Sequence, residues 1–222
     1  MASPTPGSHR DSSIREENLN REVGPQAGPA LSLELMEKTA IIDIDNTLWR
    51  FCDAFYAELK KVNSAFPPVE RWDTWDFFVG YCSEEQFLAA VDAVHRRQDS
   101  DEHQPYPEAK GFLRSLKDQG YRVVIASHRR KEMAGPTERW LSKHELVFDD
   151  LHLSFDKTVL FTDAAVVVDD APQTLEKAVA HRAIGAGLLF PWNKAYAGNG
   201  FGLFSSLDEV MVYIKKRSGE KG

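Results

Sequence analysis

Short apolar runs alternate along the chain with segments whose apolar residues recur every three or four positions. Buried parallel strands are predicted for the runs at residues 41–44, 121–126, 151–153, 164–168 and 183–190, because each run is nearly continuous in apolar residues. Helices are predicted between them, behind Pro107, behind Gly135-Pro136, around Leu175 and after Ser206. This alternation predicts an α/β fold, a doubly wound parallel sheet.

One long segment, residues 50–105, interrupts the alternation. It is predicted to form a small helical cap inserted between two segments of the core, residues 36–49 and 106–222. Its first helix ends at Pro67-Pro68, and Ser83 with Gln86 has the spacing of a capping box that opens its second helix. The many aromatic residues between these helices either pack as a small core of their own or face a ligand.

The first 35 residues differ from the rest of the chain. They are rich in Pro, Gly, Ser, Arg and Glu and hold few aliphatic residues, so we expect residues 1–35 to be a disordered leader or an added tag. Met36 directly precedes the first strand and resembles a natural start. The sequence leaves open whether the leader belongs to the native chain.

Composition and charge narrow the classes of function. The 222 residues can bury a full core, and the formal net charge of −7 disfavours a general surface for nucleic acid or for anionic membranes. No apolar run approaches the roughly 20 residues of a membrane span, and the N-terminus lacks the apolar segment of a signal peptide. Cys52 and Cys82 lie among aromatic residues, so we expect reduced thiols in a cytoplasmic protein. The oligomeric state stays open, with a homodimer as one candidate.

Polar residues that can carry chemistry follow the predicted strands. In doubly wound sheets, ligands bind outside the carboxyl ends of the strands. The residues that lie at such ends or just beyond them are Asp43, Asp45, Ser127, Lys157, Asp169 and Asp170. Their convergence predicts an active site at this edge of the sheet.

These residue types suit the cleavage of a phosphate monoester, which needs a nucleophile, an acid for the leaving oxygen and positive charge beside the phosphoryl group. Asp43 can attack phosphorus and form an aspartyl-phosphate. Asp45 can protonate the leaving oxygen and later accept a proton from water. Ser127 and Lys157 can contact the phosphoryl oxygens.

A divalent cation is also predicted, because carboxylates crowded in a dry crevice repel one another unless a cation or a shared proton relieves them. Mg²⁺ prefers hard oxygen ligands, which Asp43, Asp169 and the backbone carbonyl of Asp45 would provide. Asp170 would not bind the ion directly but would lie behind these ligands and orient them. A magnesium-dependent phosphatase is therefore expected.

Taken together, Asp43-Ile44-Asp45-Asn46-Thr47, Ser127, Lys157 and Asp169-Asp170 resemble the four motifs of the haloacid dehalogenase superfamily. The resemblance spans residues 41–172 and implies its Rossmann-like core. An aspartate two residues after the nucleophile is typical of the phosphatases of that superfamily and not of its dehalogenases. The insertion resembles the helical cap that closes over the site in the superfamily's small-molecule phosphatases.

Within the superfamily, the chain is similar to the 5'(3')-deoxyribonucleotidases. The similarity rests on Asp156-Lys157-Thr158-Val159, on residues 167–172 and on Phe51, eight residues after Asp43. It implies a nucleoside monophosphate as substrate, with Phe51 and either Trp72 or Trp75 stacking on the nucleobase. The chain departs from that family at Asn46, where glycine is usual, and at His128, where a second hydroxyl is usual.

The basic residues His128, Arg129 and Arg130 have two interpretations. They contact the substrate and select its shape or charge, or they form a solvated basic loop. We expect His128 and Arg129 to bind substrate. The histidines that show no spacing typical of a zinc site, and for which no role is predicted, are His95, His103, His144, His152 and His181.

Two other functions stay open. The first is a phosphatase of another substrate class, acting on a phosphosugar or another small phosphorylated metabolite, on a phosphoprotein or on a nucleic-acid end, although a cap leaves little room for a macromolecule. The second is a binding protein or scaffold that keeps the fold without catalysis. A scaffold is disfavoured because no predicted catalytic position is degraded.

Overall fold

The computed structural model describes residues 38–219, and within them the strands form one six-stranded parallel sheet. Its order is β3-β2-β1-β4-β5-β6, so the chain winds outward from β1 in one direction and then from β4 in the other. The strands are β1 (Lys38–Ile42), β2 (Tyr121–Ser127), β3 (Asp150–Leu153), β4 (Ala164–Val168), β5 (Ile184–Leu188) and β6 (Gly202–Phe204). The predicted doubly wound fold is confirmed. The predicted leader, residues 1–35, lies outside the described residues.

The edge strand β6 was not predicted, because its three residues form no apolar run that could be distinguished from a loop. The helices lie close to the predicted segments. They are α1 (Phe51–Val62), α2 (Glu84–Arg96), α3 (Ala109–Asp118), α4 (Ala134–Lys143), α5 (Pro172–Ala180) and α6 (Leu207–Gly219), with short 3₁₀ turns η1 (Val69–Arg71), η2 (Lys131–Met133), η3 (Thr158–Asp163) and η4 (Lys194–Tyr196). None of the described helices is long and apolar enough to cross a membrane.

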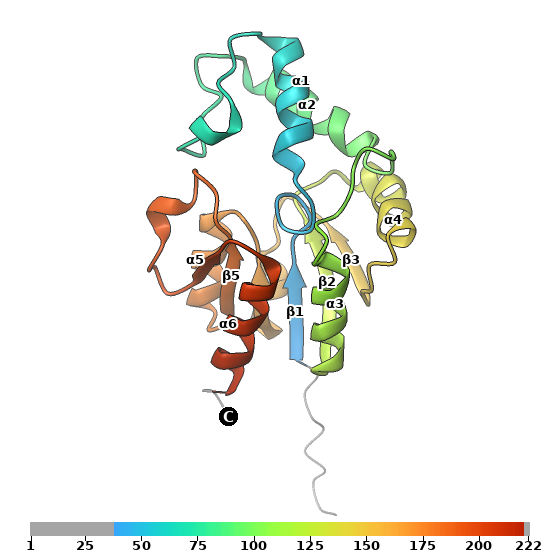
Figure 1. The fold of residues 1–222 in the computed structure, drawn as a ribbon, viewed down its shortest axis with the longest axis vertical. Coiled ribbons are helices and arrows are strands. Elements are labelled where there is room, and N and C mark those ends of the chain that lie inside the picture. Colours follow the sequence, from blue (N-terminus) through green and yellow to red (C-terminus); the bar gives the residue numbers. More distant parts are fainter. Residues whose placement is uncertain (1–37, 220–222) are drawn as a thin grey trace, which may run out of the picture. The chain divides into compact units, whose positions relative to one another are not determined.

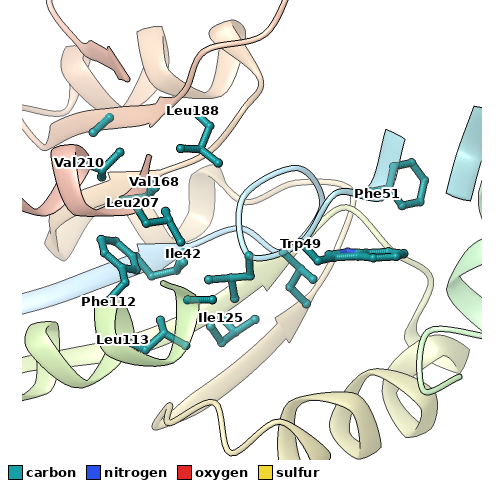
Figure 2. Close-up of a cluster of buried hydrophobic side chains, with 14 of the residues drawn as sticks. Ile42, Trp49, Phe51, Phe112, Leu113, Ile125, Val168, Leu188, Leu207 and Val210 are labelled. Atoms are coloured by element: carbon teal, nitrogen blue, oxygen red, sulfur yellow. The ribbon is translucent and has the colours of Figure 1, made fainter. Parts of the chain in front are cut away.

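Alternate residues of the central strands serve two separate cores. Ile42 on β1 belongs to the larger core, which α3 and α6 cover with Phe112 and Val210 (Figures 1 and 2). Ile41, the preceding residue, points to the opposite face and packs with Phe161 of η3 and Ala178 of α5. Burial on both faces explains why the strands are continuous in apolar residues instead of alternating.

Between β1 and α3 the chain forms α1, η1 and α2, which Figure 1 shows beyond the carboxyl ends of the strands. The predicted capping box is present, with Ser83 accepting from the Gln86 backbone and Gln86 accepting from that of Ser83. Aromatic rings join the two helices, and Phe55 of α1 meets Phe87 of α2 edge to face. Part of the aromatic stretch therefore forms a small core of its own. The boundaries of a separate cap, at 50 and 105, stay a prediction.

At Gly187, the backbone of β5 lies unusually close to the segment that follows β4, beside the predicted site. A Cβ at this position of β5 would lie 2.0 Å from the backbone oxygen of Asp169, which is far below contact distance. Because that neighbour is backbone and not the end of a flexible side chain, a side chain here would displace the segment that carries Asp169. The absence of a side chain at Gly187 therefore sets the position of Asp169.

We expect Gly187→Ala to lower the free energy of unfolding by about 1–3 kcal/mol, because the added carbon forces β5 away from Asp169. Gly111→Ala in α3 is the matched control, since nothing lies within 4 Å of its Cβ position, and it should raise stability by about 0.4–1 kcal/mol. Urea unfolding of both variants measures the difference. Equal stabilities would contradict the close approach.

Candidate active site

The sheet topology places Asp43 and Asp169 side by side. β1 and β4 are neighbours in the sheet although they are far apart in sequence. Their pairing continues one residue past β1, where the Asp43 N–H donates to Val168 O over 2.8 Å, and Val168 directly precedes Asp169. This is the point where the winding direction of the sheet reverses, which is where such folds bind ligands.

Lys157 supplies the positive charge between these two carboxylates. Its Nζ lies 2.5 Å from Asp43 Oδ1 and 2.7 Å from Asp169 Oδ2, and its side chain is 2% exposed. Burial by itself would lower the pKa of Lys157, but the carboxylates of Asp169 and Asp43 outweigh it and hold the pKa above its ordinary value. The ammonium therefore stays charged, as its predicted contact with phosphoryl oxygens requires.

Asp43, Asp169 and Asp170 form a buried group whose carboxylate oxygens lie within 4.8 Å of one another. Burial raises the pKa of Asp43 to about 7 against the effect of Lys157, and the charge of Asp169 adds to the rise. Burial likewise raises the pKa of Asp170, again with a contribution from Asp169. One ammonium thus does not neutralise the group, and hard oxygen donors with excess negative charge suit a divalent cation. The residues present fit a metal ion.

Asn46 explains how the loop after β1 reaches Asp170. Its φ of 57° is in the left-handed region, which asparagine tolerates better than most residues other than glycine. Its Nδ2 donates to Asp170 Oδ2 over 3.0 Å, and its Oδ1 accepts from the backbone N–H of Cys52 over 2.9 Å. Where glycine would supply only the backbone conformation, Asn46 also ties Asp170 to the start of α1.

Asp45 faces a different set of partners from Asp43, because β1 ends at Ile42 and the following loop turns the second carboxylate away. Arg129 Nη2 donates to Asp45 Oδ1 over 2.7 Å, and His95 Nε2 lies 2.9 Å from Asp45 Oδ2. Trp49 Nε1 donates to Oδ1 over 3.0 Å. Burial would raise the pKa of Asp45, but Arg129 and His95 overcome this effect and hold the pKa well below its usual range.

The polar residues at the end of β2 and in the loop after it differ in burial and in their partners. Ser127 is fully buried, with its hydroxyl 3.4 Å from Asp45 Oδ2. The Arg129 guanidinium is also fully buried, and besides Asp45 it donates to Thr137 Oγ1 over 2.8 Å. Arg130 is half exposed and pairs with Asp92 of α2 over 3.1 Å. The structure thus gives Arg129 internal partners, so a solvated loop describes at most part of this segment.

A cavity of about 280 Å³ opens above the carboxylates. Its floor holds Asp43, Asp45, Lys157, Asp169 and Asp170, and His128 also lines it, whereas Arg129 is not among the described lining residues. Aromatic rings form most of the remaining wall, namely Phe51, Phe55, Trp72, Trp75, Phe77, Phe78, Phe87, Phe155 and Trp192. The structure therefore brings the predicted Phe51, Trp72 and Trp75 to one cavity with the predicted catalytic residues Asp43, Asp45 and Lys157, whereas Ser127 is not among the described lining residues.

The three predicted aromatic residues differ in their surroundings. Trp72 is 2% exposed and stacks on Phe77 with ring centroids 4.0 Å apart, so packing occupies one face of its ring. Phe51 is buried against Phe55, with centroids 5.1 Å apart. Trp75 is 47% exposed at the cavity wall.

Sequence reasoning missed His95, Trp49 and Trp192. The position of Trp192 just beyond β5, at the carboxyl edge of the sheet, is a signal that could have identified it. Trp49 lies in the loop that carries Asp43 and Asp45, and Figure 2 shows it between the sheet core at Ile125 and Phe51 of α1. His95 gave no signal, because its contact with Asp45 joins residues 50 positions apart.

Comparisons with known proteins agree with this geometry. Residues 37–195 match the family model of the haloacid dehalogenase-like hydrolases, which confirms the predicted superfamily. A Chlorobaculum tepidum protein that carries the provisional name 5'(3')-deoxyribonucleotidase is 24% identical over 157 residues, covering 63% of this chain and 74% of that protein.

Solved structures share the fold. A predicted phosphatase from Clostridium acetobutylicum superposes with a TM-score of 0.58 at 18% identity, covering 82% of this chain and 99% of that one. A hydrolase of the same superfamily from Deinococcus radiodurans, with bound phosphate and sodium, also has a TM-score of 0.58, at 15% identity, covering 82% of this chain and 97% of that one. At these identities the similarity shows the fold alone.

We expect Arg129→Met to lower the free energy of unfolding by about 3 kcal/mol, because it leaves the carboxylate of Asp45 without its principal partner. Arg130→Met is the matched control, since its ion pair is half exposed, and it should cost less than about 1 kcal/mol. Chemical denaturation gives both values. A cost for Arg129→Met no larger than that for Arg130→Met would show that the buried pair does not support the fold.

Proposed function

Because this chain belongs to the haloacid dehalogenase-like hydrolases, we propose that it is a Mg²⁺-dependent phosphomonoesterase that acts through an aspartyl-phosphate, with nucleoside or deoxynucleoside monophosphates as substrates. One observation carries the proposal. Asp43 and its partner Lys157 lie on the floor of a cavity whose wall is largely aromatic. A phosphate on this floor would project its organic group between the rings.

In the first step, a carboxylate oxygen of Asp43 attacks phosphorus. The new bond joins this oxygen to phosphorus, and the bond between phosphorus and the ester oxygen breaks. The ester oxygen departs with a proton from Asp45, which must first take up that proton from solvent, because Arg129 and His95 favour its ionised form. Lys157, at 2.5 Å from Asp43, offsets charge on the phosphoryl oxygens as the group approaches.

In the second step, water attacks the phosphorus of the aspartyl-phosphate and gives a proton to Asp45. The bond between phosphorus and the Asp43 oxygen breaks, so inorganic phosphate leaves and both aspartates return to their initial states. The Ser127 hydroxyl lies 3.4 Å from Asp45 Oδ2 and can donate a hydrogen bond to it. Its proposed contact with a phosphoryl oxygen requires this hydroxyl to rotate.

Asp43 and Asp169, with the backbone carbonyl of Asp45, would hold Mg²⁺. The Asp170 carboxylate belongs to the same group, and Asn46 fixes its orientation. When bound, the ion would supply positive charge that neither Lys157 nor the backbone provides in sufficient amount.

The cavity wall favours a flat ring over a sugar as the organic group. Beyond the floor, its lining is mainly aromatic and aliphatic, with few side chains that could replace the water bound to sugar hydroxyls. A nucleobase can instead stack on an aromatic ring, and such stacking contributes about 1–3 kcal/mol per base. The provisional name of the Chlorobaculum tepidum relative points to the same class of substrate.

We expect Asp43→Asn to lower phosphate release by at least about a thousandfold, because the amide cannot act as the nucleophile. Asp53→Asn, an exposed aspartate on α1, is the control and should retain activity. Circular dichroism checks that both variants are folded. Substantial turnover by Asp43→Asn would refute the nucleophile assignment.

Substrate class is tested by phosphate release with Mg²⁺ and with EDTA across nucleoside monophosphates, deoxynucleoside monophosphates, phosphosugars and an aryl phosphate. We expect phosphate release in the presence of Mg²⁺ and none with EDTA, together with a preference for nucleotides. Trp75→Ala should raise KM for nucleotides by about tenfold, since it removes one stacking ring at an exposed position, with little effect on phosphosugars. Equal activity on phosphosugars and nucleotides would instead identify a general small-molecule phosphatase.

A further inference from the structure

The carboxylate of Asp45 is held from three parts of the chain. Trp49 reaches Oδ1 from its own loop, and Ser127 and Arg129 approach from the loop after β2. His95, whose Nε2 is 2.9 Å from Oδ2, comes from α2 in the insertion. Among the described partners of Asp45, His95 is the one that the insertion contributes.

The geometry of His95 defines which atom donates. Because an ionised carboxylate only accepts hydrogen bonds, the proton of this contact lies on Nε2. The imidazole is 2% exposed, and its ring packs against Phe51 with centroids 5.3 Å apart. Packing on one side and Asp45 on the other leave the ring little freedom to rotate.

Side-chain contacts hold this end of α2 against the core. Asp92, one turn before His95, accepts from Arg130 Nε over 3.1 Å. Just after α2, Asp99 accepts from Arg139 Nε over 2.6 Å, and the backbone oxygen of His103 accepts from Trp140 Nε1 over 2.6 Å. The position of His95 above Asp45 is therefore set by contacts between the insertion and the core.

We propose that His95 is a positioning residue that fixes the carboxyl group of Asp45 for proton transfer to the leaving oxygen, so that the insertion completes the acid of the reaction. Arg129 contacts both oxygens, with Nη2 2.7 Å from Oδ1 and Nε 3.3 Å from Oδ2. Trp49 also donates to Oδ1, and His95 makes the shorter contact with Oδ2, at 2.9 Å, so that together they fix the plane of the carboxyl group. This inference rests on the proposed phosphatase activity. It adds that the insertion, besides lining the cavity, holds the carboxyl group that protonates the leaving oxygen.

The role predicts a dependence on the leaving group. Benzyl phosphate and 4-nitrophenyl phosphate each carry one ring, but a benzyl alkoxide must take up a proton as it leaves, whereas 4-nitrophenolate leaves without one. The ratio kcat/KM covers the steps up to departure of the leaving group, so the later attack of water does not enter it. A residue that acts through Asp45 should therefore matter for the first substrate and little for the second.

We expect His95→Leu, which keeps much of the volume but removes the donor, to lower kcat/KM for benzyl phosphate by at least about tenfold and that for 4-nitrophenyl phosphate by less than about threefold. His95→Gln should restore most of the loss, because its amide nitrogen can reach the position of Nε2. Arg96→Gln, an exposed neighbour on the same helical turn, is the control and should match the wild type on both substrates.

Equal losses on the two substrates would overturn the inference in favour of a general structural role, as would a glutamine variant no better than leucine, or no loss at all. If His95→Leu does not fold, His95→Gln compared with His95→Asn gives the same test, because asparagine is one methylene too short to reach Asp45. A wild-type enzyme that releases phosphate from neither substrate and from no nucleoside monophosphate would instead refute the proposed function, and the inference with it. Normal wild-type activity with a flat response to His95 refutes the inference alone.

Discussion

The arrangement of this site depends on the repulsion among three carboxylates that share one buried space. Asp43, Asp169 and Asp170 lie within 4.8 Å of one another, and Lys157 gives them a single positive charge. Buried charges are stable only when they are paired and hydrogen-bonded, so each of these side chains needs a defined partner. The Asn46 bond to Asp170 and the bond from the Ala171 backbone to Asp169 meet this need. The same excess of negative charge makes the group suited to a divalent cation.

Asp45 lies only two residues after Asp43 but has different partners. It is held by the buried Arg129 and by His95, whereas Lys157 donates to Asp43 and Asp169. Their different partners shift the pKa values of the two aspartates in opposite directions, upward for Asp43 and downward for Asp45. The loop that begins after Ile42 makes this separation, since two residues in a continuous strand would face the same way.

The fold positions the site through close backbone contacts as much as through side chains. The hydrogen bond from Asp43 to Val168 and the absence of a side chain at Gly187 set the spacing between β1, β4 and β5 at their carboxyl ends. The helical insertion then adds most of the aromatic wall and His95 from beyond this edge. The core thus supplies the charged floor and part of the wall, and the insertion supplies most of the wall as well as a partner for Asp45.

Local features of the chain predict the fold class, most of the elements and the residues of the charged floor, because continuous apolar runs mark the strands and polar residues follow their ends. The resemblance to the 5'(3')-deoxyribonucleotidases implied Phe51 with Trp72 or Trp75 as aromatic contacts, and all three line the cavity. The packing of distant segments places Arg129 inside with Asp45 and brings His95 to it from α2. It likewise placed Trp192 in the cavity wall and the short strand β6 at the edge of the sheet. Apart from Trp192, whose position just beyond β5 is a local signal, these features depend on contacts between residues distant in sequence, for which neither periodicity nor spacing leaves a local trace.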